Sequence, residues 1–246
     1  MAGIRDKWHV EPHGELVVLE ENILTVEGEI VMPLGRFPRR MTVVALPEGG
    51  TVIWSPVALR EPEMERIEAL GKPEWIVAPG AAHRLDVRIW KERYPEAKLV
   101  CAPGAKDRVE EAAPVATTEN PFSGKTIDFQ VVPGCQEREA ALLVRGARGE
   151  VSLLVNDIIA NVRHPHGLGA NVMARLFGFG VKEPAVPRAG RWFFIDHPTA
   201  LANQLVAWAA IPNLRRLIPS HGDVIEAPQA TLNRLAEELA THHAAA

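Results

Sequence analysis

Short apolar runs divide the first quarter of the chain into segments typical of strands. Residues 15–31 alternate short apolar runs with acids, residues 41–46 are apolar and rich in β-branched side chains, and the pattern returns at 51–54. Proline and glycine at 47–50 mark a turn between the last two segments. The pattern predicts an antiparallel meander, which ends at Ser55 and Pro56.

Helical spacing and strand-like runs then alternate along the middle of the chain. Apolar residues recur every three or four positions in the predicted helices, and continuous apolar runs bounded by proline or glycine mark the predicted strands. The predicted elements are helix 63–70, strand 74–78, a helix through Trp90, strand 98–101, helix 107–112, strand 126–132, a hairpin of 140–144 and 151–155, a helix opened by Pro198, strand 214–218 and helix 227–240.

The segment 158–191 departs from both patterns. Repeated glycines and prolines interrupt its periodicity, apart from a brief apolar run at 172–177. A long segment without regular structure is unusual in a compact domain and often forms a lid or an oligomer contact. We therefore expect a structureless insertion here. It could form the contact between copies in a homo-oligomer.

The order of the elements indicates a layered α/β protein in which two sheets meet face to face and helices cover the outside. A chain of 246 residues is long enough for one large domain with a substantial core. We therefore expect residues 1–246 to form a single domain that carries the insertion at 158–191.

Two polar side chains stand at the ends of buried strands. Asp157 ends the apolar run 151–155, and His221 follows the strand 214–218 through Pro219 and Ser220. Strand ends are rigid and open onto loops, so they are frequent positions for functional residues. Each residue also has a structural alternative, since Asp157 could cap the following turn and His221 could be hydrogen-bonded within a buried bend.

Charge and hydropathy narrow the classes of partner. The formal net charge is −4 and no long basic run is present, which argues against nucleic acid and against an anionic membrane. No apolar segment reaches the roughly 20 residues of a membrane helix, and the first residues do not resemble a signal peptide. We therefore expect a cytoplasmic protein, for which small-molecule chemistry or protein contacts remain, and a small-molecule substrate is the first expectation.

The two cysteines do not suggest a disulfide framework in a chain of this length. Cys101 and Cys135 are more typical of free, buried thiols. Cys135 follows Pro133 and Gly134 at the end of a predicted strand, where it could also contact a ligand.

Several short motifs occur in a characteristic order. They are Trp54-Ser55-Pro56-Val57, Ala69-Leu70-Gly71, Val77-Ala78-Pro79-Gly80, His83-Arg84, Trp90, Tyr94-Pro95-Glu96-Ala97, Val155-Asn156-Asp157 and Pro219-Ser220-His221-Gly222. In this order they resemble the metallo-β-lactamase superfamily, and more closely a family of unknown function within it, over about residues 15–240. The resemblance implies a four-layer αβ/βα sandwich with a metal site on loops at one edge.

The chain departs from the superfamily's His-x-His-x-Asp-His loop. The positions of the two leading histidines correspond to Pro79 and Ala81, neither of which can bind a metal through its side chain. His83 falls at the position of the loop aspartate, Arg84 at the position of the last histidine, and Cys135 at the position of a later histidine ligand. His83 could alternatively begin the helix that carries Trp90.

The resemblance thus leaves His83, Asp157 and His221 as metal ligands, with Cys135 as a possible fourth. It implies one zinc, iron or manganese ion, or none if the site is degenerate, because imidazole and carboxylate suit such metals. The first expectation is a metal-dependent hydrolase of a small ester, amide or phosphoester, in which Asp157 orients the water and Arg84 steadies the developing negative charge. The alternative is a catalytically inactive scaffold or binding protein.

Overall fold

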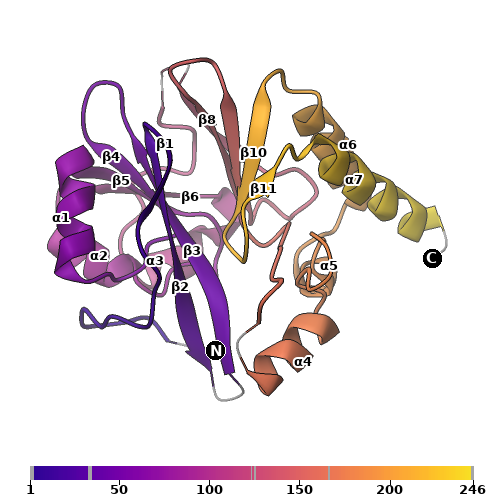
Figure 1. Cartoon of the computed structure of the whole chain (residues 1–246), viewed down its shortest axis with the longest axis horizontal. Coiled ribbons are helices and arrows are strands. Elements are labelled where there is room, and N and C mark those ends of the chain that lie inside the picture. The colour runs from indigo at the N-terminus through magenta and orange to yellow at the C-terminus, as the bar shows by residue number, and fades with distance from the viewer. Residues whose placement is uncertain (1–2, 33–34, 123, 125, 166, 245–246) are drawn as a thin grey trace.

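Strands and helices alternate through the computed structural model, which describes residues 3–32, 35–122, 124, 126–165 and 167–244. Figure 1 shows two sheets side by side, with helices on the outer face of each. The strands are β1 (Val17–Glu20), β2 (Ile23–Met32), β3 (Gly35–Ala45), β4 (Thr51–Trp54), β5 (Pro73–Ala78), β6 (Lys98–Cys101), β7 (Ile127–Val131), β8 (Ala140–Arg145), β9 (Val151–Val155), β10 (Leu214–Pro219) and β11 (Ile225–Glu226).

The helices fall into two outer layers and one separate pair. The helical segments are α1 (Glu61–Leu70), α2 (Val87–Arg93), the 3₁₀ turn η1 (Pro103–Ala105), α3 (Lys106–Glu110), α4 (Leu168–Leu176), α5 (Arg188–Phe193), α6 (Pro198–Ala209) and α7 (Gln229–Ala244). No helix in the described ranges has both the length and the apolar character needed to cross a membrane.

The first sheet has the strand order β1-β2-β3-β4-β5-β6. Strands β1 to β4 pair antiparallel, as the predicted meander requires, and β4, β5 and β6 pair parallel. Helices α1 and α2 make the crossovers between the parallel strands, because parallel neighbours cannot be joined by a tight turn. All parallel strands therefore end at the same edge of the sheet.

The second sheet has the order β11-β10-β9-β8-β7. Strands β7, β8 and β9 are antiparallel, whereas β9 and β10 are parallel, with Val155 opposite Pro219. The segment that contains α4, α5 and α6 connects these two parallel strands. The ends of β9 and β10 consequently lie next to each other, although they are far apart in sequence.

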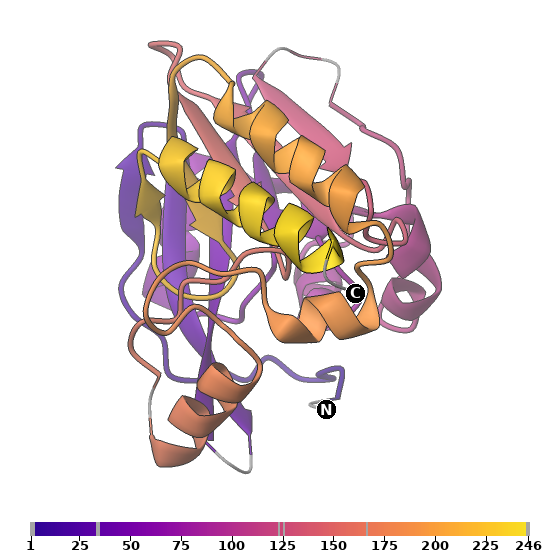
Figure 2. The same ribbon diagram turned by 90° about the vertical axis from the view of Figure 1, so that its right-hand side faces the viewer.

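Three apolar layers hold this arrangement together. The layer between the sheets includes Trp54, Leu142 and Ile218, all nearly inaccessible to solvent. A second layer packs α1, α2 and α3 on the first sheet, and a third packs α6 and α7 on the second. Figure 2 shows α6 and α7 lying across the outer face of the second sheet. The predicted four-layer αβ/βα sandwich is therefore confirmed.

The insertion at 158–191 is more ordered than its sequence predicts. It begins with buried residues, since Ala160 and Val162 pack with Phe37 and Ala174. Ala160 and Ala185 also exchange backbone hydrogen bonds of 3.0 Å in both directions. The segment then contains α4 and the start of α5, so the expectation of a structureless insertion is wrong.

Candidate metal centre

Three loops place the candidate residues at one rim of the sandwich. His83 lies in the turns between β5 and α2, Asp157 follows β9, and His221 follows β10. The parallel register of β9 and β10 brings the last two together. The indole of Trp54, at the end of β4, donates a 3.1 Å hydrogen bond to Ser220 Oγ and so ties the first sheet to the strand end that carries His221.

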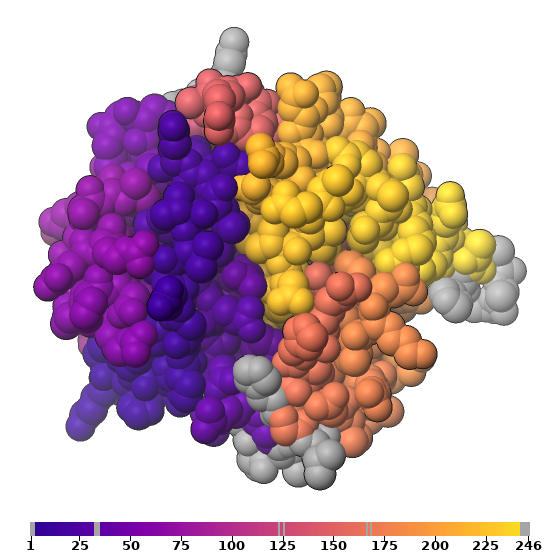
Figure 3. Space-filling view, in the orientation of Figure 1, coloured from indigo at the N-terminus to yellow at the C-terminus, as the bar shows by residue number. Residues whose placement is uncertain are grey.

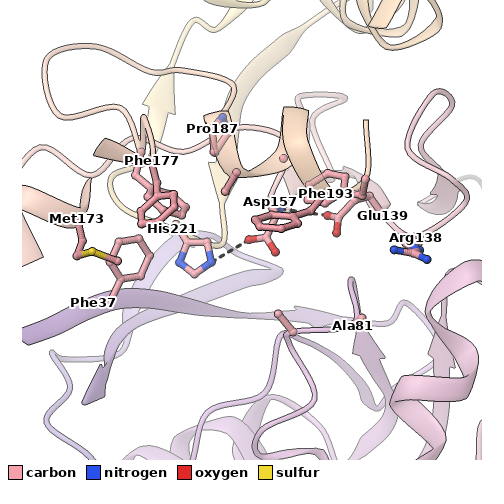
Figure 4. A pocket seen from close by; sticks show the side chains of 15 residues that line it. Phe37, Ala81, Arg138, Glu139, Asp157, Met173, Phe177, Pro187, Phe193 and His221 are labelled. Atoms are coloured by element: carbon pink, nitrogen blue, oxygen red, sulfur yellow. Dashed lines mark hydrogen bonds and ion pairs between the residues drawn. The ribbon is translucent and has the colours of Figure 1, made fainter. Parts of the chain in front are cut away.

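The three side chains converge on one point. Asp157 Oδ1 lies 3.0 Å from His221 Nε2 and 3.4 Å from His83 Nε2. The two Nε2 atoms are 3.2 Å apart. The imidazoles are almost fully buried, while the side chain of Asp157 is 22% exposed. Figure 4 shows the contact between His221 and Asp157, which both face a pocket. Within the described part of the chain, His83, Asp157 and His221 form a group whose possible ligand atoms all lie within 4.8 Å of one another. We call it the metal centre.

The outer nitrogen of each imidazole has a fixed partner. His221 Nδ1 is 2.8 Å from the backbone oxygen of Pro38, and His83 Nδ1 is 2.8 Å from Ser55 Oγ. Ser55 has a φ of 56°, in the left-handed region that is unfavourable for a residue with a side chain. Such second contacts fix the orientation of metal-binding histidines and leave Nε2 available to the ion.

The tautomer of His221 determines what can lie between its Nε2 atom and Asp157. A backbone oxygen can only accept a hydrogen bond, so His221 Nδ1 carries the proton in the bond to Pro38. In neutral His221 the Nε2 atom is therefore an unprotonated acceptor, and it faces the Asp157 carboxylate. Two acceptors at this distance repel each other unless a proton or a cation lies between them. The geometry thus requires positive charge at this point.

The donor spacing fits a bound metal ion. In a tetrahedral zinc site with bonds of about 2.05 Å, neighbouring donor atoms lie about 3.3 Å apart. The three observed separations, from 3.0 to 3.4 Å, are close to this value. Two imidazoles and one carboxylate are also a common ligand set for zinc, iron and manganese. His83, Asp157 and His221 therefore suit a single divalent ion.

The electrostatics favour the metal-binding forms of His83 and Asp157. Burial lowers the pKa of His83, against the opposing charge of Asp157. Burial alone would raise the pKa of Asp157, but the charges and hydrogen bonds of His83 and His221 outweigh it and hold that pKa below its usual range. A neutral imidazole and an ionised carboxylate are the forms that bind a metal ion.

A second carboxyl group lies beside Asp157. Glu139 is buried, and its Oε2 atom accepts hydrogen bonds from Asn156 Nδ2 at 3.0 Å and from the Asp157 backbone N–H at 3.1 Å. Burial and the negative charge of Asp157 raise the pKa of Glu139 well above its usual value. The pKa values of the two neighbouring carboxyl groups are therefore shifted in opposite directions, that of Asp157 downward and that of Glu139 upward.

Replacement of Glu139 with glutamine is expected to stabilise the metal-free protein increasingly as the pH rises. A raised folded-state pKa contributes stability below the unfolded value of about 4.5, and this contribution is lost at higher pH. The difference between Glu139→Gln and wild type should grow by up to about 1.4 kcal/mol per pH unit within the affected range. Urea unfolding of chelator-treated protein between pH 5 and pH 8 measures it.

The exposed Glu65 on α1 provides the control for this experiment. Glu65→Gln removes an exposed carboxyl group, and its unfolding free energy should follow that of the wild type across the same pH range. A pH-independent difference between Glu139→Gln and wild type would contradict a raised pKa of Glu139.

A largely apolar pocket of about 540 Å³ opens beside the group. Asp157, His221, Glu139 and Arg138 supply its polar side chains, and Figure 4 shows Asp157 and His221 at its inner wall. Small residues from the turn after β5 and from α5 line part of the rest, and the larger apolar side chains come from β3, α4, α5 and the adjoining turns: Phe37, Met173, Phe177, Phe179, Pro187, Phe193 and Phe194. The pocket therefore suits a ligand that presents a bulky apolar group and one polar group.

Two sequence-predicted residues lie away from the group. The Arg84 guanidinium contacts the Ala81 backbone oxygen and Glu111 Oε2, the latter at 3.1 Å, and Arg84 does not line the pocket. Cys135 is fully buried in the apolar layer beneath α6, and burial raises the pKa of its thiol. A protonated, buried thiol is a poor metal ligand. The structure thus brings together His83, Asp157 and His221, but neither Arg84 nor Cys135.

Sequence reasoning missed the residues that orient the group. Pro38 and Ser55 hold the imidazoles, and Glu139 and Asn156 support Asp157. Ser55 and Asn156 lie within the motifs that carry the resemblance, but the resemblance implies no role for either residue. Pro38 contributes a backbone oxygen, which has no signature in the sequence. Glu139 stands just before an apolar strand, and that position was the one available signal.

Comparison with known proteins supports the fold. No protein-family model and no curated protein matches the chain. Among solved structures, the chain resembles the DIM-1 metallo-β-lactamase exposed to ceftazidime, at 14% identity and a TM-score of 0.62, over 94% of this chain and 99% of that one. It also resembles the FIM-1 metallo-β-lactamase from Pseudomonas aeruginosa in its mono-zinc form, at 12% identity and a TM-score of 0.59, over 94% and 98% of the two chains.

A further likeness shows how widely this fold is used. The metal-soaked Flv1 flavodiiron core from Synechocystis sp. PCC6803 matches at 11% identity and a TM-score of 0.61, over 92% of this chain and 60% of that one. The closer likeness to a family of unknown function stays a prediction. The sandwich, the strand order and these structural neighbours together show that the chain has the fold of the metallo-β-lactamase superfamily.

Proposed function

We propose that His83, Asp157 and His221 bind one divalent metal ion, with zinc as the first candidate and iron or manganese as the others. The contact between His221 Nε2 and Asp157 Oδ1 carries this proposal, because the Pro38 oxygen fixes the proton on the other nitrogen. The likeness to a metallo-β-lactamase solved in a mono-zinc form supports a single ion. Pro79 and Ala81, which cannot bind metal through their side chains, support the same number.

We further propose that the protein hydrolyses a small ester, amide or phosphoester that carries an apolar group. A divalent ion at this site would make a water molecule acidic enough to attack at neutral pH. The Asp157 carboxylate, which faces the pocket, orients the attacking water by accepting a hydrogen bond. Ser55 and Pro38 hold the two imidazoles, and the aromatic walls exclude water and position the apolar group of the substrate.

Elemental analysis of protein purified without chelator tests the metal site. We expect about one equivalent of zinc, iron or manganese in total per chain. Replacement of His83 or His221 with alanine should remove most of it, because each replacement leaves only two ligands. The exposed His197 provides a matched control, and His197→Ala should keep the full equivalent.

The alternative is an inactive scaffold that keeps the sandwich without the chemistry. Metal content well under one equivalent for all three metals, together with a melting temperature unchanged by added zinc, would favour it. In that case the positive charge between His221 and Asp157 is a proton, and the two residues form a buried ion pair. The cytoplasmic location and the homo-oligomer stay predictions.

A further inference from the structure

The strongest feature outside the metal centre is an exposed apolar surface on α4 and α5. Val172 and Leu176 on α4 are 64% and 53% exposed, and Trp192 and Phe193 on α5 are 63% and 67% exposed. Side chains of this size normally lie in the core, and clusters of them mark interaction sites. Figures 1 and 2 show α4 and α5 at one edge of the molecule, outside the two helix layers. We call these four residues the rim surface.

Contacts between the two helices join the rim surface into one unit. The rings of Phe177 and Trp192 are 6.3 Å apart, and the Arg188 backbone N–H, at the start of α5, donates a 2.8 Å hydrogen bond to the Phe177 oxygen. Val172 and Leu176 are four residues apart, so they share one face of α4. In Figure 3 this salmon-to-orange segment forms an outer lobe of the molecule.

The rim surface continues into the pocket beside the metal centre. Met173 and Phe177, each one position beyond an exposed rim residue, line the pocket, and Phe193 belongs to both. The apolar lining of the pocket therefore includes one residue of the rim surface and two residues next to it in sequence. A ligand with a long apolar chain could pass from the rim surface into the pocket.

The charge around the rim surface differs in sign from that of the whole chain. Residues 158–193 carry five basic side chains and one acidic one, a net charge of +4, so the rest of the chain carries −8. Arg175 and Arg188 are exposed, and among the described residues neither forms an ion pair. Exposed aromatic and aliphatic side chains beside unpaired arginines are typical of elements that bind an anionic lipid surface.

We propose that α4 and α5 dock the protein on an anionic lipid bilayer, with Trp192 and Phe193 entering the headgroup region and Arg175 and Arg188 contacting lipid phosphates. A second copy of this chain is a poorer occupant, because a symmetric contact would place the same positive patches against each other. The net charge of −4 on the whole chain opposes binding to an anionic surface, so the proposal depends on the local charge of +4 on residues 158–193. The docking itself does not depend on the metal centre.

Docking narrows the substrate class, and this step alone rests on the proposed hydrolase function. Phe193 of the rim surface also lines the pocket, so the enzyme would take amphiphilic esters, amides or phosphoesters from the bilayer. Short, water-soluble substrates lack an apolar chain that could contact the apolar lining of the pocket, so they would be poorer substrates.

Vesicle binding by the full chain tests the docking. Wild type should sediment with vesicles of mixed phosphatidylcholine and phosphatidylglycerol but not with phosphatidylcholine alone, and salt should weaken the binding. Tryptophan emission should shift to the blue on binding, because Trp192 leaves water while Trp54, Trp90 and Trp208 are already buried. W192F should keep most of the binding and lose most of the shift.

Variants of the rim surface make the test specific. W192A/F193A should abolish sedimentation, and R175Q/R188Q should lower the partition coefficient by about 30-fold, since each basic residue near an anionic surface contributes about 1 kcal/mol. V18A is the matched control, because Val18 on β1 is 60% exposed and lies outside α4 and α5, and it should bind as wild type does.

Three results would overturn the docking proposal. They are equal binding to neutral and anionic vesicles, no sedimentation with either at low salt, or a wild-type dimer in light scattering that W192A/F193A makes monomeric without any vesicle binding. D157N, which removes a proposed metal ligand, should still bind vesicles. A wild-type protein that contains well under one equivalent of metal but still binds vesicles would therefore refute the proposed function alone.

Discussion

Asp157→Asn is expected to lower the affinity for zinc by at least about 100-fold. Replacing a residue that only orients a metal ligand can already lower metal affinity by up to about 100-fold, and Asp157 is itself a proposed ligand. The amide keeps the shape of the side chain but removes the charge that the His83 and His221 imidazoles face. At a free zinc concentration of 100 times the wild-type Kd, binding should stabilise wild type by about 2.7 kcal/mol and the variant by less than about 0.4 kcal/mol. Urea unfolding with and without zinc measures both.

The exposed carboxyl group of Asp107, in the first turn of α3, provides the matched control. Asp107→Asn changes the net charge by the same amount and should keep the full stabilisation by zinc. Zinc stabilisation of Asp157→Asn equal to that of wild type would show that Asp157 is not a ligand.

Gly222→Ala is expected to cost more than about 3 kcal/mol of unfolding free energy, at the upper end of the effects of single substitutions. Gly222 has a φ of 91°, and an added Cβ would lie 2.1 Å from the backbone oxygen of Asn161. That oxygen cannot move freely, because it accepts a 2.9 Å hydrogen bond from the Asp223 N–H. The bend that carries His221 must therefore shift, and thermal or urea denaturation measures the cost.

Gly49→Ala separates backbone strain from the clash. Gly49 has a similar φ of 98°, but an added Cβ would meet no atom within 4 Å. Its cost should be only about 1 to 2 kcal/mol, the usual penalty for a side chain in the left-handed region. Equal effects of the two substitutions would mean that Asn161 yields easily and that the bend is not held in place.

Strands and helices with a clear hydrophobic period were predictable from the sequence. Strand β6 at 98–101 and the β8–β9 hairpin fall where the apolar runs place them, and α1 and α7 begin within two residues of their predicted starts. Strand β11 was missed, because it contains two residues and depends on its pairing with β10. A pairing between distant segments leaves no local pattern.

Strand β3 shows why one boundary was wrong. The predicted strand begins at 41, whereas β3 begins at Gly35 and passes through Pro38. Strand β4 pairs with β3 only from Thr42 onward, so one side of residues 35–40 has no strand partner. Proline is tolerated on such a free edge. The same free edge leaves the Pro38 oxygen available to His221.

The helices α4 and α5 could not be predicted, because tertiary contacts stabilise them more than their own sequences do. Gly167 and Gly169 near the start of α4 and Gly190 within α5 weaken helical propensity. Packing of Ala174 against Phe37, and of Phe177 against Trp192, compensates for this. Neither contact can be recognised from the local sequence pattern.

The candidate metal centre was predictable in part. Asp157 and His221 follow from the strand ends, whereas His83 depended on the resemblance. The prediction of Cys135 as a possible fourth metal ligand rested only on its position in the chain. The Gly134 backbone oxygen accepts hydrogen bonds from the Asp196 and His197 N–H groups at the start of α6, and the thiol is buried beneath that helix. Side-chain direction of this kind depends on the packing of distant elements.

The order of the two sheets along the chain has a consequence for fragments of the protein. Every strand of the first sheet precedes β7, and every strand of the second follows β6. A cut between Thr117 and Asn120 would therefore give one piece with a single donor, His83, and another with two, Asp157 and His221. Neither piece alone has the full set, so recovery of tight zinc binding on mixing would report the reassembly of two complementary half-proteins.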